Sequence, residues 1–246
     1  MPELRQRTAT GATWMLGFKL VDRGIGVVSI LILARLLVPA DFGLVAVATA
    51  IVGIIALLAQ FSFDTALIQD QRAGRDSYDT AWTISLAFGL MIALVLLALA
   101  RPIAIFYEEP RLEAVMYFLA LGSVFEGCQN IGVVAFRKDL QFHKEFIFLA
   151  GRKMVGFLVT VPLAFLWRDH WALVAGIVAS KGATLIMSFV MHPYRPRLSL
   201  AAWRKLFHFS KWLMINNVIF TIRDRLADFI IAKTAGTGRK KTSGSK

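Results

Sequence analysis

The chain has 246 residues, of which 57% are hydrophobic and 18% charged, and its mean hydropathy is +0.62. Soluble proteins contain about 45–50% apolar and about 25% charged residues, so this composition excludes a disordered chain, a disulfide scaffold and a cytosolic enzyme. The net charge is +12, but basic residues between apolar segments reflect membrane orientation more often than nucleic-acid binding. The single cysteine, Cys128, excludes an internal disulfide and is expected to be a packing residue.

The amino terminus lacks the pattern of a cleaved signal peptide. Its apolar stretch runs over residues 15–38 and contains charged residues, among them Lys19, Asp22 and Arg23. A signal peptide instead has a short apolar core followed by a small-residue cleavage site. We therefore expect a retained membrane helix.

Seven apolar segments are long enough to cross a bilayer as helices, which takes about 20 residues. Their predicted bounds are Thr13–Leu37, Phe42–Phe61, Thr80–Ala100, Val115–Ala135, Phe146–Trp167, Trp171–Met191 and Leu213–Ala232. The first and seventh contain charges and are assigned on length and context. Because the connections are short, the sequence predicts an all-α polytopic membrane helix bundle.

The lysines and arginines of alternate loops predict the orientation of this bundle. One side has 12 and the other has 3, and cytoplasmic loops are the ones enriched in these residues. We therefore expect the amino terminus and His192–Lys211 to be cytoplasmic and Glu108-Glu109 to be periplasmic. The basic tail after the seventh span breaks the pattern, because it would lie on the outer side.

The first span contains three charges that share one helix face. Lys19, Asp22 and Arg23 are spaced three and four residues apart, and each charge at mid-bilayer costs about 2.5–3.5 kcal/mol. Two interpretations remain open. Asp22 neutralises Lys19 or Arg23 and the group joins helices, or the group lines a polar cavity with one net positive charge.

Lys181 lies near the middle of the sixth span and needs a partner or water. Three residues of the fourth span, Glu126, Gln129 and Asn130, form a polar turn that could supply this partner. Lys153, near the start of the fifth span, is instead expected to extend its charge toward the interface.

The seventh span is too polar to face lipid on every side, and we expect it to border a cavity or a partner bundle. Its charges include Arg223 and Asp224. The predicted substrate-binding residues of the cavity are therefore Lys19, Asp22, Arg23, Lys181, Arg223 and Asp224.

The sequence contains no recognisable catalytic or metal-binding motif. Its four histidines lack zinc-ligand spacing, and it has no Gly-rich phosphate loop, nucleophile elbow or HExxH. Glu108-Glu109 are adjacent on a predicted exposed turn and are interpreted as solvated charge. We expect neither an enzyme nor a bound cofactor or metal.

Several short motifs occur in order along the chain. They are Leu31–Leu44 (LILARLLVPADFGL), 63–69 (FDTALIQ), 104–107 (AIFY) with Pro110, 136–142 (FRKDLQF), 194–197 (YRPR) before 207–210 (FHFS), and 224–231 (DRLADFII). Together they resemble the Wzx-like polysaccharide exporters of the multidrug/oligosaccharidyl-lipid/polysaccharide (MOP) superfamily, over nearly all of Met1–Thr237.

This resemblance implies a transporter of two six-helix lobes that rock around a central cavity. It would flip an undecaprenyl-pyrophosphate-linked oligosaccharide across the bacterial cytoplasmic (inner) membrane, and Lys19, Arg23, Lys181 and Arg223 would neutralise the pyrophosphate. The implied partners are this lipid-linked oligosaccharide, membrane lipids, a glycan polymerase and glycosyltransferases, and no nucleic acid.

The resemblance also implies a division of the chain. Residues 1–191 would form the first lobe, 192–212 a cytoplasmic amphipathic linker, 213–232 the first helix of an incomplete second lobe, and 233–246 a basic, disordered tail. Since such transporters have two complete lobes, we expect a truncated member that inserts but does not export glycan alone.

Three other functions remain open. The chain could belong to a cation-coupled drug or metabolite exporter of the same superfamily. It could be a non-transporting membrane scaffold that recruits glycan polymerases. A membrane glycosyl- or acyltransferase is the third alternative, although the sequence offers no convergent catalytic set for it.

Overall fold

A computed structural model of the chain describes residues 2–58, 63–69, 73–204 and 206. Every regular element within these ranges is a helix, which confirms the predicted all-α class. The elements are α1 (Pro2–Leu36), α2 (Pro39–Leu58), α3 (Phe63–Gln69), α4 (Arg75–Phe106), α5 (Arg111–Gly127), the 3₁₀ helix η1 (Ile131–Val133), α6 (Val134–Lys138), α7 (Phe142–Trp167) and α8 (Trp171–Met191).

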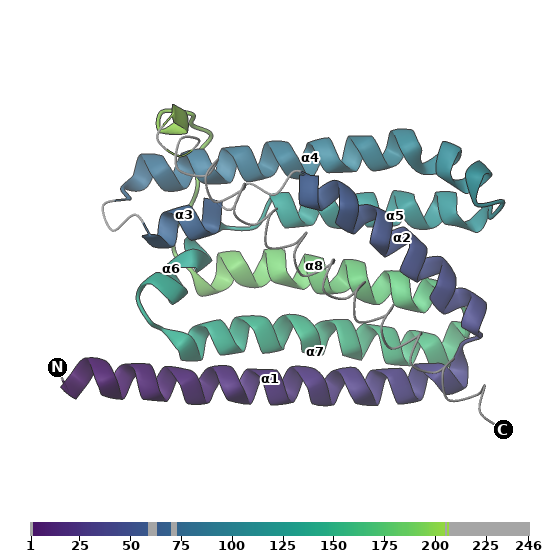
Figure 1. Cartoon of the computed structure of the whole chain (residues 1–246), viewed down its shortest axis with the longest axis horizontal. Helices are drawn as coiled ribbons and strands as arrows, with labels where there is room; N and C mark the ends of the chain where they lie inside the picture. The colour runs from purple at the N-terminus through teal and green to yellow at the C-terminus, as the bar shows by residue number, and fades with distance from the viewer. Residues whose placement is uncertain (1, 59–62, 70–72, 205, 207–246) are drawn as a thin grey trace, which may run out of the picture.

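Five long helices lie side by side in the order α4, α5, α8, α7, α1, and α2 crosses over them obliquely (Figure 1). The chain reverses direction at both ends of this bundle. We call the end that contains the first turn of α1 and the short helices α3 and α6 the near end. The opposite end, with the α4–α5 and α7–α8 turns, is the far end.

Helix α2 covers the main apolar core. Its Leu44, Val45 and Ala48 are buried against residues of α4, α5 and α8, among them Leu96 and Val115. A second cluster lies at the near end, where α3 packs on the start of α4 and on η1 and α6. The bundle is therefore held by apolar contacts along its length and at its near end.

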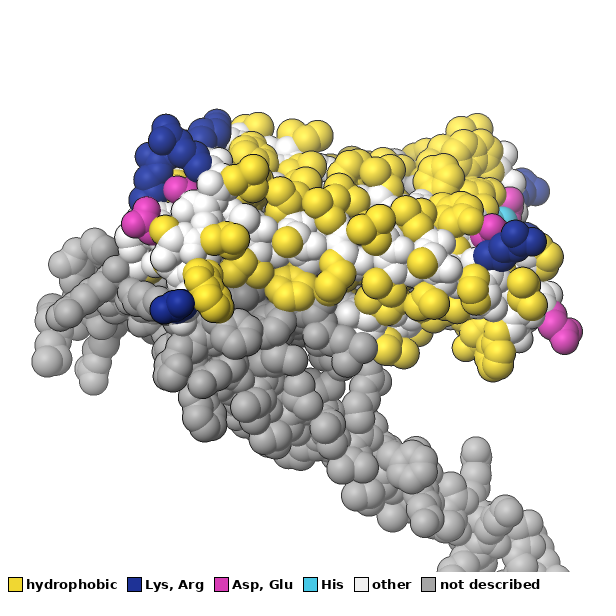
Figure 2. Space-filling model, turned by 90° about the horizontal axis from the view of Figure 1, so that it is seen from above, with side chains coloured by type: hydrophobic (Ala, Val, Ile, Leu, Met, Phe, Trp, Pro, Cys, Tyr) yellow, Lys and Arg dark blue, Asp and Glu magenta, His cyan; other side chains and the backbone are white. Residues whose placement is uncertain are grey.

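Several of the described helices have the length and apolar composition of membrane spans. Four of them, in α2, α4, α7 and α8, are long and apolar enough to cross a bilayer, and the bent pair α5 with η1–α6 makes a fifth. In Figure 2 apolar side chains cover the middle of the visible face, while charged side chains gather at its two ends. The chain is a multi-pass membrane protein.

Most predicted spans correspond to observed helices with shifted ends. Trp171–Met191 is confirmed as α8, and the predicted fifth span is α7 with four more residues at its start. Helix α1 begins at Pro2 rather than Thr13, and α4 extends beyond both predicted ends to Arg75–Phe106.

The prediction of one continuous fourth span, Val115–Ala135, is wrong. Helix α5 ends at Gly127, and the chain resumes at Ile131 with a bend of 63°. The side-chain oxygen of Asn130 accepts a hydrogen bond from the backbone N–H of Gly132 at 2.9 Å, and the backbone N–H of Asn130 donates to Ser188 Oγ at 2.9 Å. These bonds satisfy backbone groups that a continuous helix would have paired.

The predicted linker and seventh span are described only in part. Residues 192–200 have no regular structure and lead to a turn at 201–202. The predicted helix Leu213–Ala232 and the tail 233–246 lie outside the described residues.

Helices α4 and α5 approach each other closely because two glycines face each other. A Cβ on Gly89 would lie 2.7 Å from Gly127 Cα and 2.9 Å from the Ser123 carbonyl oxygen. Small residues of this kind allow membrane helices to pack without side chains between them.

We predict that Gly89→Ala destabilises the bundle, because the methyl group would force α4 and α5 apart. Overpacking of this kind costs about 1–3 kcal/mol. Gly53→Ala in α2 is the matched control, since its Cβ meets nothing within 4 Å. Thermal unfolding in detergent should show a lower midpoint for Gly89→Ala alone. Equal midpoints for the two variants would contradict the close packing.

Candidate functional site

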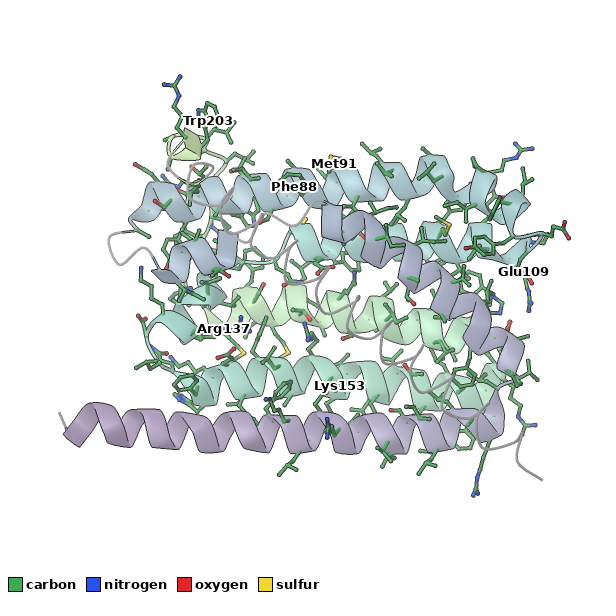
Figure 3. All side chains as sticks on the ribbon, in the orientation of Figure 1. Phe88, Met91, Glu109, Arg137, Lys153 and Trp203 are labelled. Atoms are coloured by element: carbon green, nitrogen blue, oxygen red, sulfur yellow. The ribbon has the colours of Figure 1, made fainter. Side chains whose placement is uncertain are left out.

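The Asp22 side chain of α1 pairs with Lys153 of α7. Lys153 Nζ lies 3.0 Å from Asp22 Oδ1, and each side chain is 41% exposed. Figure 3 shows Lys153 between the two helices, about halfway along the bundle. The interpretation in which Asp22 joins helices through an ion pair agrees with this contact, but its partner is Lys153 rather than Lys19 or Arg23, because α1 packs along α7.

Lys19 and Arg23 lie on the flank of α1 next to this ion pair. Both are exposed in the described part of the chain, where neither has an ionic partner. Val21 and Val28, which lie on the opposite side of the helix by their spacing, are 37% and 46% exposed. Helix α1 therefore has a cationic flank and an apolar flank.

Lys181 of α8 pairs with Glu126 of α5, which confirms the predicted partner. Its Nζ donates to Glu126 Oε2 at 2.7 Å. The lysine stem passes over Gly122, where an added Cβ would lie only 3.0 Å from Lys181 Cδ. The side chains of Lys181 and Glu126 are 25% and 64% exposed, so the pair opens to the surface of the bundle.

Lys181 and Glu126 lie on the same faces of α8 and α5 as the residues that pack in the core cluster with α2. Lys181 follows Val174 by seven residues, and Glu126 follows Leu119 by seven, so each shares a helix face with that residue. Val174 and Leu119 are both buried in the core cluster beneath α2. The pair therefore lies farther toward the near end on this same side of the bundle.

Among the predicted cavity residues that the structure describes, none is joined by an ion pair or hydrogen bond to another. Asp22 and Lys181 each pair with a residue outside that set, Lys153 and Glu126. Arg223 and Asp224 lie outside the described residues. The expectation that Lys153 only extends toward the interface is also corrected, since it holds α7 to α1.

A hollow of about 970 Å³ lies elsewhere, between α5, α7 and α8. Its lining includes Phe118, Leu121, Val159 and Ala175, and Asp169 is its one charged residue. None of the predicted cavity residues lines it. An apolar hollow on the surface of a membrane bundle has hydrocarbon as its natural surroundings, so it is not the cationic site.

An ionic cluster at the far end was missed by the sequence analysis. Asp41 of α2 and His170, just before α8, are each 4% exposed. His170 Nδ1 lies 3.9 Å from Asp41 Oδ1 and also contacts Asp169. Arg111 Nη1 lies 3.6 Å from Asp41 Oδ1. The four residues come from three different turns, so no sequence spacing brings them together.

This far-end cluster neutralises charge where three turns meet. Arg111 also donates to Glu109 at 2.8 and 3.0 Å, and this bond lowers the pKa of the Glu109 carboxyl. Asp41, Asp169 and His170 place ligand atoms within 4.8 Å of one another. The Arg111 guanidinium already supplies positive charge there, so the arrangement fits an ion-pair network that fastens the turns.

A second ion pair that the sequence analysis missed joins α6 to α7 at the near end. The carboxylate of Glu145, which is 3% exposed, contacts Arg137 (Figure 3). The other oxygen, Glu145 Oε2, has no hydrogen-bond partner. This pair fixes the short helix α6 against the start of α7.

Comparisons with known proteins point to polysaccharide assembly. The family described as "Polysaccharide biosynthesis protein" matches residues 32–239. The chain is 25% identical over 239 residues to "Lipopolysaccharide biosynthesis protein WzxC" of Escherichia coli (strain K12), covering 96% of this chain and 49% of that protein. It is 29% identical over 209 residues to "Succinoglycan biosynthesis transport protein ExoT" of Rhizobium meliloti (strain 1021), covering 83% and 42%.

A third relative, "Uncharacterized membrane protein in cps region" of Klebsiella pneumoniae, is 22% identical over 238 residues, covering 95% of this chain and 49% of the relative. The chain thus spans about half the length of the curated relatives it matches. No solved structure matches it. The resemblance inferred from the motifs is confirmed, and because the family match extends over most of its length, the chain belongs to the polysaccharide biosynthesis protein family, with Wzx-type relatives.

Proposed function

We propose that the chain serves in a transporter that flips a polyprenyl-diphosphate-linked oligosaccharide across the bacterial cytoplasmic membrane by alternating access. The Rhizobium relative is named as a transport protein for succinoglycan biosynthesis, which supports transport over a purely scaffolding role. In the proposed substrate the glycan is linked to a polyprenyl diphosphate, and this diphosphate is the anionic group that the transporter would bind.

The observation that carries the proposal is the cationic flank of α1. Lys19, Arg23 and Lys153 outnumber Asp22, which leaves two net positive charges halfway along the bundle. Exposed charges at this depth cannot face hydrocarbon at acceptable cost, so they border water or a partner. A diphosphate group entering this site would gain charge-assisted hydrogen bonds from the lysines and the arginine.

The Lys181–Glu126 pair adds a charge that a ligand could engage, on the side of the bundle where α2 packs. Glu126 is the more exposed member of the pair, and an anion that displaced its carboxylate would find Lys181 held over Gly122. We propose that Lys181 takes part in this way, with Arg223 completing the cavity and Asp224 balancing its charge.

In this proposal residues 1–191 form the first lobe, 192–212 connect it to a second, 213–232 are the second lobe's first helix, and 233–246 are a basic tail. Glycan polymerase and glycosyltransferases would be its partners at the membrane. The near end would face the cytoplasm, because most basic residues of the described loops lie there, among them Arg75, Lys138 and Arg197.

We predict that a cysteine at position 198 is cytoplasmic and one at position 109 is periplasmic, each introduced alone in a Cys128→Ser background. A membrane-impermeant maleimide should label position 109 in intact cells and position 198 only after permeabilisation. Leu198 is 72% exposed, so its accessibility to the reagent depends on the membrane. The reverse labelling pattern would contradict the orientation.

We predict that the double substitution Lys19→Gln with Arg23→Gln reduces surface polysaccharide export by tenfold or more when made in the complete protein. Hydrogen bonds to charged groups contribute about 1.5–3 kcal/mol each, and about 1.4 kcal/mol corresponds to a factor of ten. Export would be measured in a strain that lacks its own copy, with protein levels followed by immunoblot.

The matched control for this experiment is Arg101→Gln with Arg168→Gln, which removes the same charge from exposed far-end positions. It should leave export unchanged. Full export by the Lys19/Arg23 variant would show that these cations do not handle the substrate. Binding of hydrophobic cations by the wild-type protein, without binding of polyprenyl diphosphate, would favour the drug or metabolite exporter.

A further inference from the structure

The segment after α8 is fastened to the near end of the bundle by a buried carboxylate. Asp79, in the first turns of α4, is 5% exposed. Its Oδ1 accepts a hydrogen bond from the Tyr194 hydroxyl at 2.6 Å and another from the Arg197 backbone N–H at 2.7 Å. Asp79 therefore joins two points of a segment more than 100 residues away in the chain.

Tyr194 is fixed from three sides. Its carbonyl accepts from Asn130 Nδ2 at 2.6 Å, and its N–H donates to His192 Nδ1 at 3.2 Å. Burial and the bond to Asp79 raise the pKa of the Tyr194 phenol, which keeps the hydroxyl a donor. Burial lowers the pKa of His192, which keeps its ring neutral and able to accept.

The segment stays attached beyond Arg197. The Ser199 N–H donates to Thr83 Oγ1 at 3.0 Å, and the Ala202 N–H donates to Thr80 Oγ1 at 3.1 Å. Leu206 is 3% exposed and packs in the near-end apolar cluster with Leu67 and Ala81. Thr80 and Thr83 of α4, like Asp79, therefore accept hydrogen bonds from backbone N–H groups of this segment.

We propose that residues 194–204 and Leu206 form a strap that is a fixed part of the bundle, with Asp79 as the residue that positions it. Release of the strap would break both hydrogen bonds to the Asp79 carboxylate and leave Arg75, at 3.6 Å, as its ionic partner. Hydrogen bonds to a charged acceptor are stronger than those between neutral groups, so the closed strap is favoured.

The strap determines where the rest of the chain can begin to move. It carries the chain from α8, in the middle of the bundle, to the edge formed by α4, where Trp203 lies (Figure 3). Movement of later segments against the bundle would therefore start beyond Leu206 and at the α4 edge. This inference goes beyond the proposed transport function, because it holds whatever the substrate is.

Limited trypsin digestion of the purified chain in lipid nanodiscs tests the strap. Mass spectrometry would follow cleavage of the Arg197–Leu198 bond, whose rate reports how often the strap opens. Asp79→Ala should speed this cleavage about tenfold, equivalent to about 1.4 kcal/mol. Asp76→Ala is the matched control, because Asp76 lies in the same helix turn and is exposed. It should leave the rate unchanged.

Cleavage after Arg152 in α7 distinguishes a loosened strap from a loosened bundle. If Asp79→Ala accelerates cleavage at both sites, Tyr194→Phe decides, because it removes one donor to Asp79 and keeps the ring. Faster cleavage after Arg197 alone in Tyr194→Phe would support the strap. The deciding variant is the one, Asp79→Ala or Tyr194→Phe, in which cleavage after Arg152 stays as slow as in the wild type. If that variant is also cleaved after Arg197 at the wild-type rate, the proposed strap is wrong.

Discussion

The free-energy cost of placing polar groups in hydrocarbon governs the architecture. Within the described spans the backbone satisfies its own groups by forming helices. The charged side chains within the bundle are either paired with a neighbouring helix or exposed on its surface. Asp22 and Glu126 pair with lysines of neighbouring helices, whereas Lys19 and Arg23 remain exposed on one flank of α1. The proposed function rests on this difference between paired and exposed charges.

The polar residues at the two ends of the bundle act differently from those at its middle. At the far end, Arg111, Asp41 and His170 bring three turns together. At the near end, Asp79 and Asn130 bind backbone groups of the strap and of the broken fourth span. These contacts fix the ends of the helices, and in the proposed function the charges halfway along are the ones that recognise a ligand.

Much of the fold could be predicted from the sequence because apolar segment length is a local property. The bounds of α8 were predicted without error, and the partner of Lys181 followed from one polar turn in a neighbouring span. The break at Asn130 was missed because its cause, Ser188 and Tyr194, lies 58 and 64 residues away. The Asp22–Lys153 pair and the far-end cluster were missed for the same reason, since they depend on which helices become neighbours.

Cysteine accessibility along α1 tests the central claim most directly. Single cysteines at positions 19, 21, 23 and 28, in a Cys128→Ser background of the complete protein in native membranes, would be treated with a small water-soluble thiol reagent. We predict rapid reaction at 19 and 23 and little reaction at 21 and 28, because only the cationic flank borders water. Equal reaction at all four positions, or faster reaction at 21 and 28, would contradict this prediction.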